Sequence, residues 1–394
     1  MAEHVSRRHF LGASAAGAPA LAQPALAAAQ AAGIKPADLA IKEVKVYVTT
    51  RGRLASVVTN SGIEGNYTLA TRYFHPNWSN LGWLEYAKPA LLGKSALDLP
   101  ALTSQYAPQN RRLGQLSYAS AIDNCLWDIL GKAVGLPVYR ILGAYHDRVL
   151  AYASSQHLKT VEDFVADVEK TKAEGFRAYK IHPPWLPGNA VDHRLDMDVA
   201  RAVRKAAGDS FPLLFDRVGA YNRYEAMEVG RLLDELKYAA YEDPLPTSDI
   251  EGCAELCRAL DVPIHLGEFI FSPYNFAEYI RRGAVDVVRF IVDNVGGITG
   301  GMKIARLAEL FGMECAPHNW GDALDHAVHF HCELAMPNNV WFEMTQPQGI
   351  SDRPYIKDKV RIAKDGYVYA PTKAGLGYEI DYGELEKATK SIER

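Results

Sequence analysis

Eight short apolar runs, alternating with segments of helical periodicity, fill the chain between residues 149 and 344. The runs are Val149–Ser154, Ala178–His182, Pro212–Val218, Tyr238–Asp243, Pro263–Glu268, Val287–Val292, Glu314–His318 and Val340–Met344. Val161–Phe176, Tyr224–Leu236 and Thr299–Phe311 are examples of the helical segments. Alternating strands and helices form parallel sheets with covered faces, and eight repeats predict a closed (β/α)8 barrel. A doubly wound open sheet is the alternative, but no glycine-rich phosphate loop follows the first strand.

A different pattern precedes the barrel. Residues 41–48 alternate as a strand, and Leu54–Asn60 reads as a second strand that ends at a Ser-Gly turn. Ser120–Lys132 carries apolar residues at helical spacing, and Gly135 followed by Pro137 ends that helix. These signals predict an α+β unit.

The domain boundaries follow from these changes of pattern. We expect the α+β domain over residues 41–148 and the barrel over residues 149–358. The remaining residues, 359–394, return to short strand and turn signals, and we expect this C-terminal segment to pack on the front domain.

The N-terminus differs in composition from the rest of the chain. Ser6–Leu11 contains paired arginines followed by Phe-Leu, and Ala25–Ala27 offers the small residues that a signal peptidase needs. No acidic residue occurs between Glu3 and Asp38. We therefore predict a twin-arginine-type signal peptide over residues 1–30 and a periplasmic product. A disordered or amphipathic N-terminal arm is the alternative.

Composition excludes several classes of protein. The chain is 48% apolar, and its 43 Lys and Arg residues against 47 Asp and Glu give a net charge of −4. That balance does not suit nucleic-acid binding, and no run of about 18 apolar residues could span a membrane. The five cysteines form no Cys-x-x-Cys pair, so the fold is not expected to depend on disulfides.

Three carboxylates close three consecutive predicted barrel strands. Asp216, Glu242 and Glu268 are separated by 26 residues each time, which is one strand–helix repeat. We expect them to point at one spot over the barrel mouth, where three anions need a divalent cation as partner. Oxygen-only ligation favours Mg²⁺ or Mn²⁺ over zinc. A single strand-end carboxylate is more often a helix cap or an ion-pair partner, but three in register favour a metal site.

Other strand ends carry basic groups. Lys180 and His182 share a face of the second strand, and His318 ends the seventh. A nearby metal ion should lower the pKa of Lys180 and make it a usable base. Glu343, at the end of the eighth strand, could donate a hydrogen bond to an oxyanion if its pKa is raised. A surface lysine, a structural histidine and a plain salt bridge are the alternatives.

Together these residues resemble the enolase superfamily, and within it the mandelate racemase-like group of acid-sugar dehydratases and racemases. The resemblance covers residues 41 to 386 and depends on the order and spacing of several motifs. The motifs are the helix at 121–132, Tyr-Glu-Asp-Pro at 241–244, Leu-Gly-Glu at 266–268, Gly-Gly-Ile-Thr at 296–299, Pro-His-Asn-Trp-Gly at 317–321 and Gly-Leu-Gly-Tyr-Glu-Ile-Asp at 375–381.

The resemblance implies a fold and a first chemical step. It implies an α+β capping domain over the barrel mouth and one Mg²⁺ on Asp216, Glu242 and Glu268. The shared step would remove a proton from the carbon next to a substrate carboxylate, giving a metal-held enediolate. Relatives commonly form symmetric dimers or octamers, so a homo-oligomer is expected.

The resemblance also implies roles for the remaining site residues. Lys180 matches a base on one face of the substrate, and His318 matches the base or acid on the other. Glu343 matches the group that stabilises the enolate. His182 falls where many relatives carry a second lysine, and we expect it to polarise the substrate carboxylate.

Two positions depart from the pattern of the family. Relatives usually carry, five residues before the Gly-Gly pair, an Asp that orients the catalytic histidine, but this chain has Ile291 there. Asp293, two residues later, is on the same strand face if no bulge intervenes, and we retain it as a candidate substrate-binding residue. Val218 stands where many relatives have Asn or His.

The leading hypothesis is Mg²⁺-dependent dehydration of an acid sugar, in which Lys180 or His318 takes the α-proton and the other, most simply His318, protonates the departing hydroxyl. A racemase or epimerase of a 2-hydroxy acid would use the same two bases. A non-catalytic exported sugar-acid binding protein is a third possibility. A zinc hydrolase would use His326, His329 and His331, whose spacing better fits a packed helix face.

The sequence does not specify which acid sugar would bind. Substrate choice depends on front-domain loops around residues 49–54 and 66–78, which carry no readable motif. Their aromatic residues could line a sugar pocket or simply pack; these are Tyr67, Tyr73, His75 and Trp78.

Overall fold

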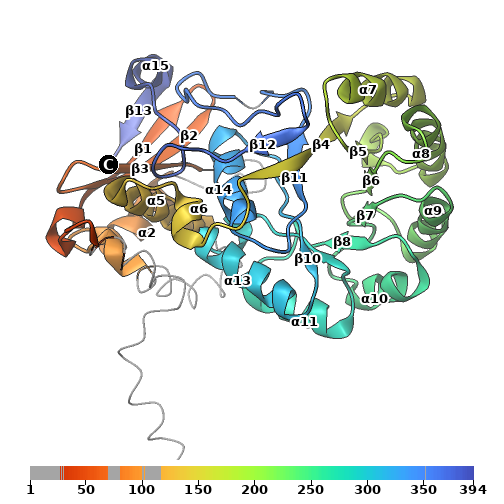
Figure 1. The fold of residues 1–394 in the computed structure, drawn as a ribbon, viewed down its shortest axis with the longest axis horizontal. Helices are drawn as coiled ribbons and strands as arrows, with labels where there is room; N and C mark the ends of the chain where they lie inside the picture. The colour runs from red at the N-terminus through yellow and green to blue at the C-terminus, as the bar shows by residue number, and fades with distance from the viewer. Residues whose placement is uncertain are drawn as a thin grey trace, which may run out of the picture.

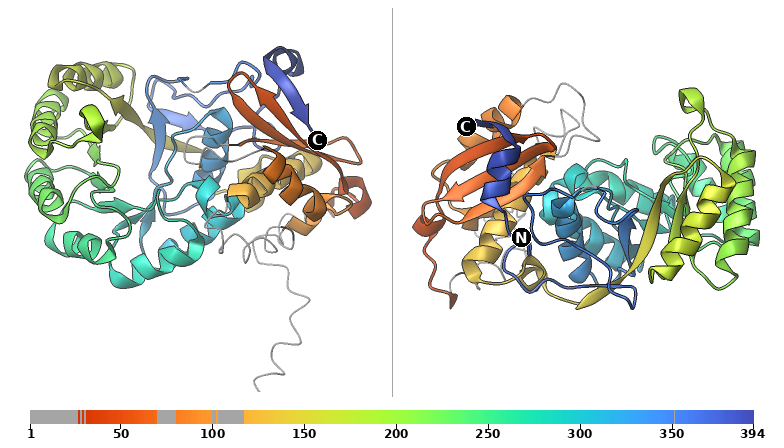
Figure 2. Two further views of the ribbon diagram at one scale, coloured as in Figure 1. Left: turned by 180° about the vertical axis from the view of Figure 1, so that it is seen from behind. Right: turned by 90° about the horizontal axis from the view of Figure 1, so that it is seen from above.

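The computed structural model describes residues 27, 29, 31–69, 80–99, 102, 117–350 and 352–394. The Arg-Arg motif of the predicted signal peptide lies outside these residues, as do Tyr73, His75 and Trp78. The described chain forms a capping domain and a barrel of parallel strands with helices on its outside (Figures 1 and 2). This confirms the predicted barrel and α+β capping domain.

The capping domain is built on a four-stranded antiparallel sheet in the order β13-β1-β2-β3. Its first three strands are β1 (Ile41–Thr49), β2 (Gly52–Thr59) and β3 (Glu64–Leu69). Its helices are α2 (Asn80–Leu91), α5 (Ser117–Val134) and α6 (Val138–Leu142), with the short 3-10 turns η2 (Pro36–Leu39) and η3 (Ala96–Asp98).

The barrel contains eight parallel strands in the order β10-β9-β8-β7-β6-β5-β4-β11, so the first barrel strand lies beside the last. Their bounds are β4 (Arg148–His157), β5 (Tyr179–His182), β6 (Leu213–Asp216), β7 (Ala240–Glu242), β8 (Ile264–Leu266), β9 (Val287–Val288), β10 (Glu314–Cys315) and β11 (Trp341–Thr345). Between β10 and β11 the ladder is interrupted, and the Cys315 N–H donates instead to the Asn338 carbonyl at 2.9 Å.

Helices connect these strands on the outer surface. They are α7 (Val161–Ala173), α8 (His193–Ala207), α9 (Arg223–Glu235), α10 (Ile250–Ala259), α11 (Pro273–Arg282), α12 (Val292–Val295), α13 (Gly297–Leu310) and α14 (Ala323–Leu334), with the turn η4 (Pro187–Asn189) before α8. The predicted strand Val287–Val292 differs most from the structure. Strand β9 covers only its first two residues, and helix α12 begins at Val292.

The C-terminal segment returns to the front of the molecule. Strand β12 (Tyr367–Tyr369) pairs antiparallel with β4, and helix α15 (Tyr382–Ala388) leads into β13 (Thr389–Glu393). Strand β13 pairs antiparallel with β1 and completes the capping sheet, as expected from the sequence.

Helix α5 joins the two domains. Its Asn124 accepts a hydrogen bond from the Ile298 N–H at 3.1 Å, and Asp123 accepts one from the Thr299 N–H at 2.9 Å. Gly297 allows this contact, because its φ is +77° and a Cβ there would lie 2.4 Å from Asp123 Oδ2. The first glycine pair of the sequence motifs is therefore part of the contact between cap and barrel.

All five cysteines are free thiols. Among the described residues, none of the helices combines the length and apolar character needed to cross a bilayer.

Candidate active site

The three predicted metal ligands meet at the carboxyl ends of neighbouring strands. Asp216 ends β6, Glu242 ends β7 in register with it, and Glu268 follows β8 by two residues. One carboxylate oxygen of each lies within 4.8 Å of the other two, and all three side chains are buried. The regular 26-residue spacing thus places three carboxylates at one point, as the sequence predicts.

Each of these carboxylates contacts one of the predicted basic side chains. The pairs are His182 Nε2 with Asp216 Oδ2 at 3.0 Å, Lys180 Nζ with Glu242 Oε2 at 2.9 Å, and His318 Nε2 with Glu268 Oε2 at 3.0 Å. Lys180 and His182 belong to β5 and His318 follows β10, so in the strand order the bases flank the three carboxylate-bearing strands β6, β7 and β8 on both sides.

The residues around the carboxylates fit a divalent cation. Burial raises the pKa of Glu242 well above its ordinary value in spite of Arg289, and the Asp216 carboxylate adds to the effect. The adjacent Asp243 is also fully buried, and neither of its carboxylate oxygens has a hydrogen-bond partner among the described residues. A buried set of three carboxylates, with burial raising the pKa of Glu242 and a further unpartnered carboxylate at Asp243, suits a hard cation such as Mg²⁺.

Glu242 also belongs to a ring of four fully buried side chains in which basic and acidic residues alternate. We call Lys180, Glu242, Arg289 and Glu343 the charge ring. Its contacts are Lys180 Nζ to Glu242 Oε2 at 2.9 Å, Glu242 Oε1 to Arg289 Nε at 2.8 Å, Arg289 to Glu343 Oε2 at 2.7 Å, and Glu343 Oε1 to Lys180 Nζ at 2.7 Å. Each charge therefore has two opposite charges beside it.

Glu343 is held as a carboxylate rather than as an acid. Besides Lys180 and Arg289, it accepts hydrogen bonds from Ser154 Oγ at 2.7 Å and from the Asn319 N–H at 3.0 Å. Burial alone would raise the pKa of Glu343, but Lys180 and Arg289 outweigh it and hold that pKa well below 4.5. The hypothesis from the sequence that the pKa of Glu343 is raised is therefore wrong, because its contacts lower that pKa.

Lys180 has no exposed surface, and its ammonium also lies 3.3 Å from Asp216 Oδ2. Burial alone would lower the pKa of Lys180, but Glu242 and Glu343 outweigh it and raise that pKa well above 10.5. The expected lowering of this pKa is thus opposed by the carboxylates of the charge ring. Whether Lys180 acts as a base stays a prediction.

His182 is oriented by the first barrel strand. Its Nδ1 lies 2.7 Å from the Ser155 carbonyl, which can only accept, so Nδ1 carries the proton and Nε2 faces Asp216. Two aromatic rings flank it edge-on, His157 at 5.3 Å and Trp320 at 4.7 Å between ring centroids. Sequence analysis did not single out these two neighbours.

Comparison with known proteins places this site in a family. Residues 163–384 match the family described as "Enolase C-terminal domain-like", and residues 28–143 match "Mandelate racemase / muconate lactonizing enzyme, N-terminal domain". The chain belongs to the enolase superfamily. Within that superfamily it falls in the mandelate racemase-like group.

Several enolase-superfamily dehydratases are similar to the chain. It is 29% identical to the arabinonate dehydratase of Saccharolobus solfataricus over 76% of this chain and 80% of the relative. It is 31% identical to the L-talarate/galactarate dehydratase of Salmonella typhimurium over 74% and 71%, respectively. The structure of D-glucarate dehydratase from Agrobacterium tumefaciens complexed with magnesium has 28% identity and a TM-score of 0.78, with 90% of this chain and all of that one covered. The chain is an enzyme of the lyase type.

Asp293 contacts the cap, whereas the corresponding Asp of the family is expected to orient the catalytic histidine. It belongs to helix α12, and its Oδ1 accepts a hydrogen bond from Tyr67 of the cap at 2.6 Å. The catalytic-histidine candidate His318 instead lies beside Glu268. The strand-face argument fails for Asp293 because β9 ends at Val288 and Asp293 belongs to helix α12. Its role in substrate binding stays a prediction.

Arg289 is a site residue that sequence analysis missed. It has no exposed surface and contacts both Glu242 and Glu343. The available signal was a lone arginine in the apolar run Val-Val-Arg-Phe-Ile-Val, where a barrel strand buries every second residue in the interior.

The histidines of the zinc alternative serve the packing of α14. His329 Nε2 accepts the Val292 N–H at 3.0 Å, and His331 Nδ1 accepts the Tyr139 N–H at 3.0 Å. Burial lowers the pKa of His326 and of His331 to about 4. Among the described residues, the one cluster of three or more metal-ligating side chains is Asp216, Glu242 and Glu268.

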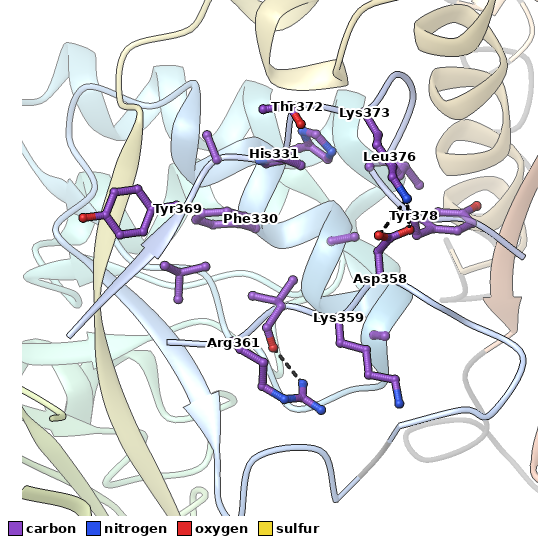
Figure 3. A pocket seen from close by; sticks show the side chains of 17 residues that line it. Phe330, His331, Asp358, Lys359, Arg361, Tyr369, Thr372, Lys373, Leu376 and Tyr378 are labelled. Carbon is purple, nitrogen blue, oxygen red and sulfur yellow. Dashed lines mark hydrogen bonds and ion pairs between the residues drawn. The ribbon is translucent and has the colours of Figure 1, made fainter. Parts of the chain in front are cut away.

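A cavity of about 350 Å³ lies between α14 and the C-terminal segment (Figure 3). Lys373 Nζ lies 2.7 Å from Asp358 in its wall, and Arg361 pairs with Asp352. These cations are neutralised within the chain, and none of the predicted catalytic or metal-binding side chains lines the cavity.

Proposed function

We propose that the chain catalyses the Mg²⁺-dependent dehydration of an acid sugar. The observation that carries the proposal is the cluster Asp216, Glu242 and Glu268, buried and flanked by bases from two sides. Its relatives named as arabinonate, galactarate and glucarate dehydratases support the choice of substrate class. These three carboxylates would hold Mg²⁺, whose charge would stabilise the enolate form of the substrate carboxylate.

We assign the removal of the α-proton to the β5 side of the site. Lys180 is enclosed by three carboxylates and has no exposed surface, so its role is to orient Glu242 and Glu343. His182 can serve as the base when its Nε2 is not donating to Asp216, because Nδ1 already donates to the Ser155 carbonyl. Once Nε2 has taken a proton, it can donate to Asp216 and hold the proton there.

We assign the departing β-hydroxyl to His318 on the opposite side. Its Nε2 lies 3.0 Å from Glu268 Oε2, across the carboxylate cluster from His182, where a general acid would act on the opposite side of the substrate. The buried carboxylate Glu343 fixes both Lys180 and the backbone N–H of Asn319, which follows His318. The charge ring thus positions groups on both sides of the substrate.

The test is a screen of acid sugars with Mg²⁺ in D₂O, followed by NMR. We expect a 2-keto-3-deoxy acid from at least one sugar. His318→Asn should abolish this product yet retain exchange of the α-proton, whereas His182→Asn should lose both. Absence of product and of α-proton exchange with every acid sugar would contradict the proposal.

The same experiment separates the alternatives. A racemase or epimerase would label both stereoisomers with deuterium and form no keto acid. A sugar-acid binding protein would bind a sugar without either reaction. A structural neighbour named as a mandelate racemase/muconate lactonizing protein is the observation that favours the racemase alternative.

We also propose export of the chain, on the basis of the Arg-Arg-His-Phe-Leu sequence near its start. Cell fractionation tests this proposal. A full-length cytoplasmic chain that retains Met1 or Ala2 would contradict it. Assembly into a homo-oligomer is a further proposal, for which light scattering of the purified protein is the test.

A further inference from the structure

The loop after β5 presents a tryptophan at the carboxyl end of the barrel. Trp185 is 37% exposed, although most large aromatic side chains of the described barrel are buried. The guanidinium carbon of Arg217 lies 4.4 Å from the centroid of its ring. One side of the indole is therefore covered by a cation, and part of the remaining ring surface is open.

This loop is anchored at several points. The carbonyl of Pro183 accepts from His157 Nδ1 at 2.7 Å and from Arg217 at 3.3 Å, and the carbonyl of Pro184 accepts from Arg217 at 3.2 Å. Arg217 is itself fully buried and lies 3.1 Å from Asp196. Because buried charged and polar groups hold its backbone, the loop presents Trp185 in a fixed place.

The orientation of the indole is also fixed. Trp185 Nε1–H donates to His157 Nε2 at 3.2 Å, which requires the tautomer that the Pro183 carbonyl selects at Nδ1. Burial and the neighbouring His182 lower the pKa of His157 to about 4, so the ring is neutral and Nε2 can accept. The polar group of Trp185 is thereby used, and its open surface is purely apolar.

A series of short contacts links Trp185 to the carboxylate cluster. Its ring centroid lies 5.6 Å from that of His157, which lies 5.3 Å from that of His182, whose Nε2 is 3.0 Å from Asp216. Trp185 therefore lies two ring contacts from His182. The loop that carries it follows the carboxyl end of β5, the same end of the barrel at which Asp216, Glu242 and Glu268 meet.

We propose that Trp185 is a stacking platform for the end of the acid sugar remote from its carboxylate. The inference rests on the proposed function and names which part of the substrate the loop would recognise. The C–H groups of a polyol chain offer an apolar face that fits an aromatic ring, while hydroxyl groups keep their hydrogen bonds. Trp185 would thus favour five- and six-carbon acids over shorter ones.

The test compares Trp185→Ala with Trp185→Phe in the full chain with Mg²⁺, using the substrate found in the NMR screen. Trp185→Ala should raise KM about tenfold and change kcat less than about twofold, because the ring contacts a part of the substrate that does not react. Trp185→Phe should recover most of the loss, because it keeps a ring face. Tyr224→Ala, which removes a 71% exposed aromatic side chain on α9, is the matched control and should leave KM unchanged.

A second readout separates stacking from a general loss of structure. The inhibition constant of the shortest acid sugar that competes with the substrate should be the same in wild type and Trp185→Ala. An equal loss for short and long acids, or an unchanged KM for the long substrate, would overturn the inference while leaving the proposed function intact. If wild type neither binds nor converts any acid sugar, both fall together.

Discussion

Two buried carboxyl groups in different parts of this molecule, Glu343 and Asp293, have pKa values shifted in opposite directions. In the charge ring, Glu343 lies between Lys180 and Arg289, which hold its pKa well below 4.5. At the contact between cap and barrel, Asp293 is equally enclosed, but its partner is the phenol of Tyr67, and burial raises its pKa to about 7. Burial alone therefore does not set the pKa of a carboxyl group, because the charges and donors beside it also act.

The number of available protons explains the contacts among Tyr67, Asp293 and Asp325. Tyr67 contacts Asp293 Oδ1 and, at short range, Asp325 Oδ1, yet a phenol has one proton to donate. The second contact needs a proton on one of the two carboxyl groups. Asp123, which joins α5 to Thr299, also has a pKa raised to about 7 by burial. We expect the cap–barrel contact to respond to pH near neutrality and Glu343 not to.

The largest effect is expected from Arg289→Met. This change leaves Glu242 and Glu343 buried with one cation fewer, which should lower the free energy of unfolding by about 3–5 kcal/mol. Urea unfolding measures it. Arg306→Met, which removes an exposed pair with Glu309, is the control and should cost about 0–1 kcal/mol. Equal losses in the two variants would show that the charge ring is not a special source of stability.

A smaller effect, and one that depends on pH, is expected at Asp123. Because its pKa is raised in the fold from 3.8 to about 7, the folded chain binds the extra proton. The contribution of Asp123 to stability is present below pH 4 and is lost as pH rises toward 7, a change of about 2–4 kcal/mol. Asp123→Asn should remove this slope between pH 4 and pH 8. Parallel pH profiles for the variant and wild type would contradict the assignment.

The smallest of these effects is expected from Tyr67→Phe. Loss of the phenol leaves Asp293 and Asp325 without their shared donor and should cost about 1–3 kcal/mol. The cost should be greater at pH 8 than at pH 5, because protonated carboxyl groups can hydrogen-bond each other. Chemical unfolding at the two pH values tests this, and a cost that does not change with pH would remove the distinction between the two groups.

Much of this arrangement could be predicted from sequence alone because it follows from periodicity. The 26-residue interval gives three strand ends of the same kind, so Asp216, Glu242 and Glu268 meet whatever the details of packing. Lys180 and His182 share a strand, and the alternation of a strand places both at the site.

The parts of the site that could not be predicted depend on contacts that residue spacing in the sequence does not reveal. The charge ring requires Arg289, which directly follows β9, to reach Glu242 on β7 and Glu343 on β11, and the closed barrel brings these together. Asp293 lies on a short helix rather than on the expected strand, so its carboxyl group reaches the cap instead of His318. Trp185 acquires its place from a loop held by Arg217 and His157.

Titration of Mg²⁺ into the chelator-treated protein by calorimetry tests the central claim most directly. Wild type should bind one Mg²⁺ per chain, and Glu268→Gln, which replaces one carboxylate with an amide of the same shape, should lose this binding or weaken it at least tenfold. Equal binding by the two proteins, or none by wild type, would show that the three converging carboxylates are not a metal site.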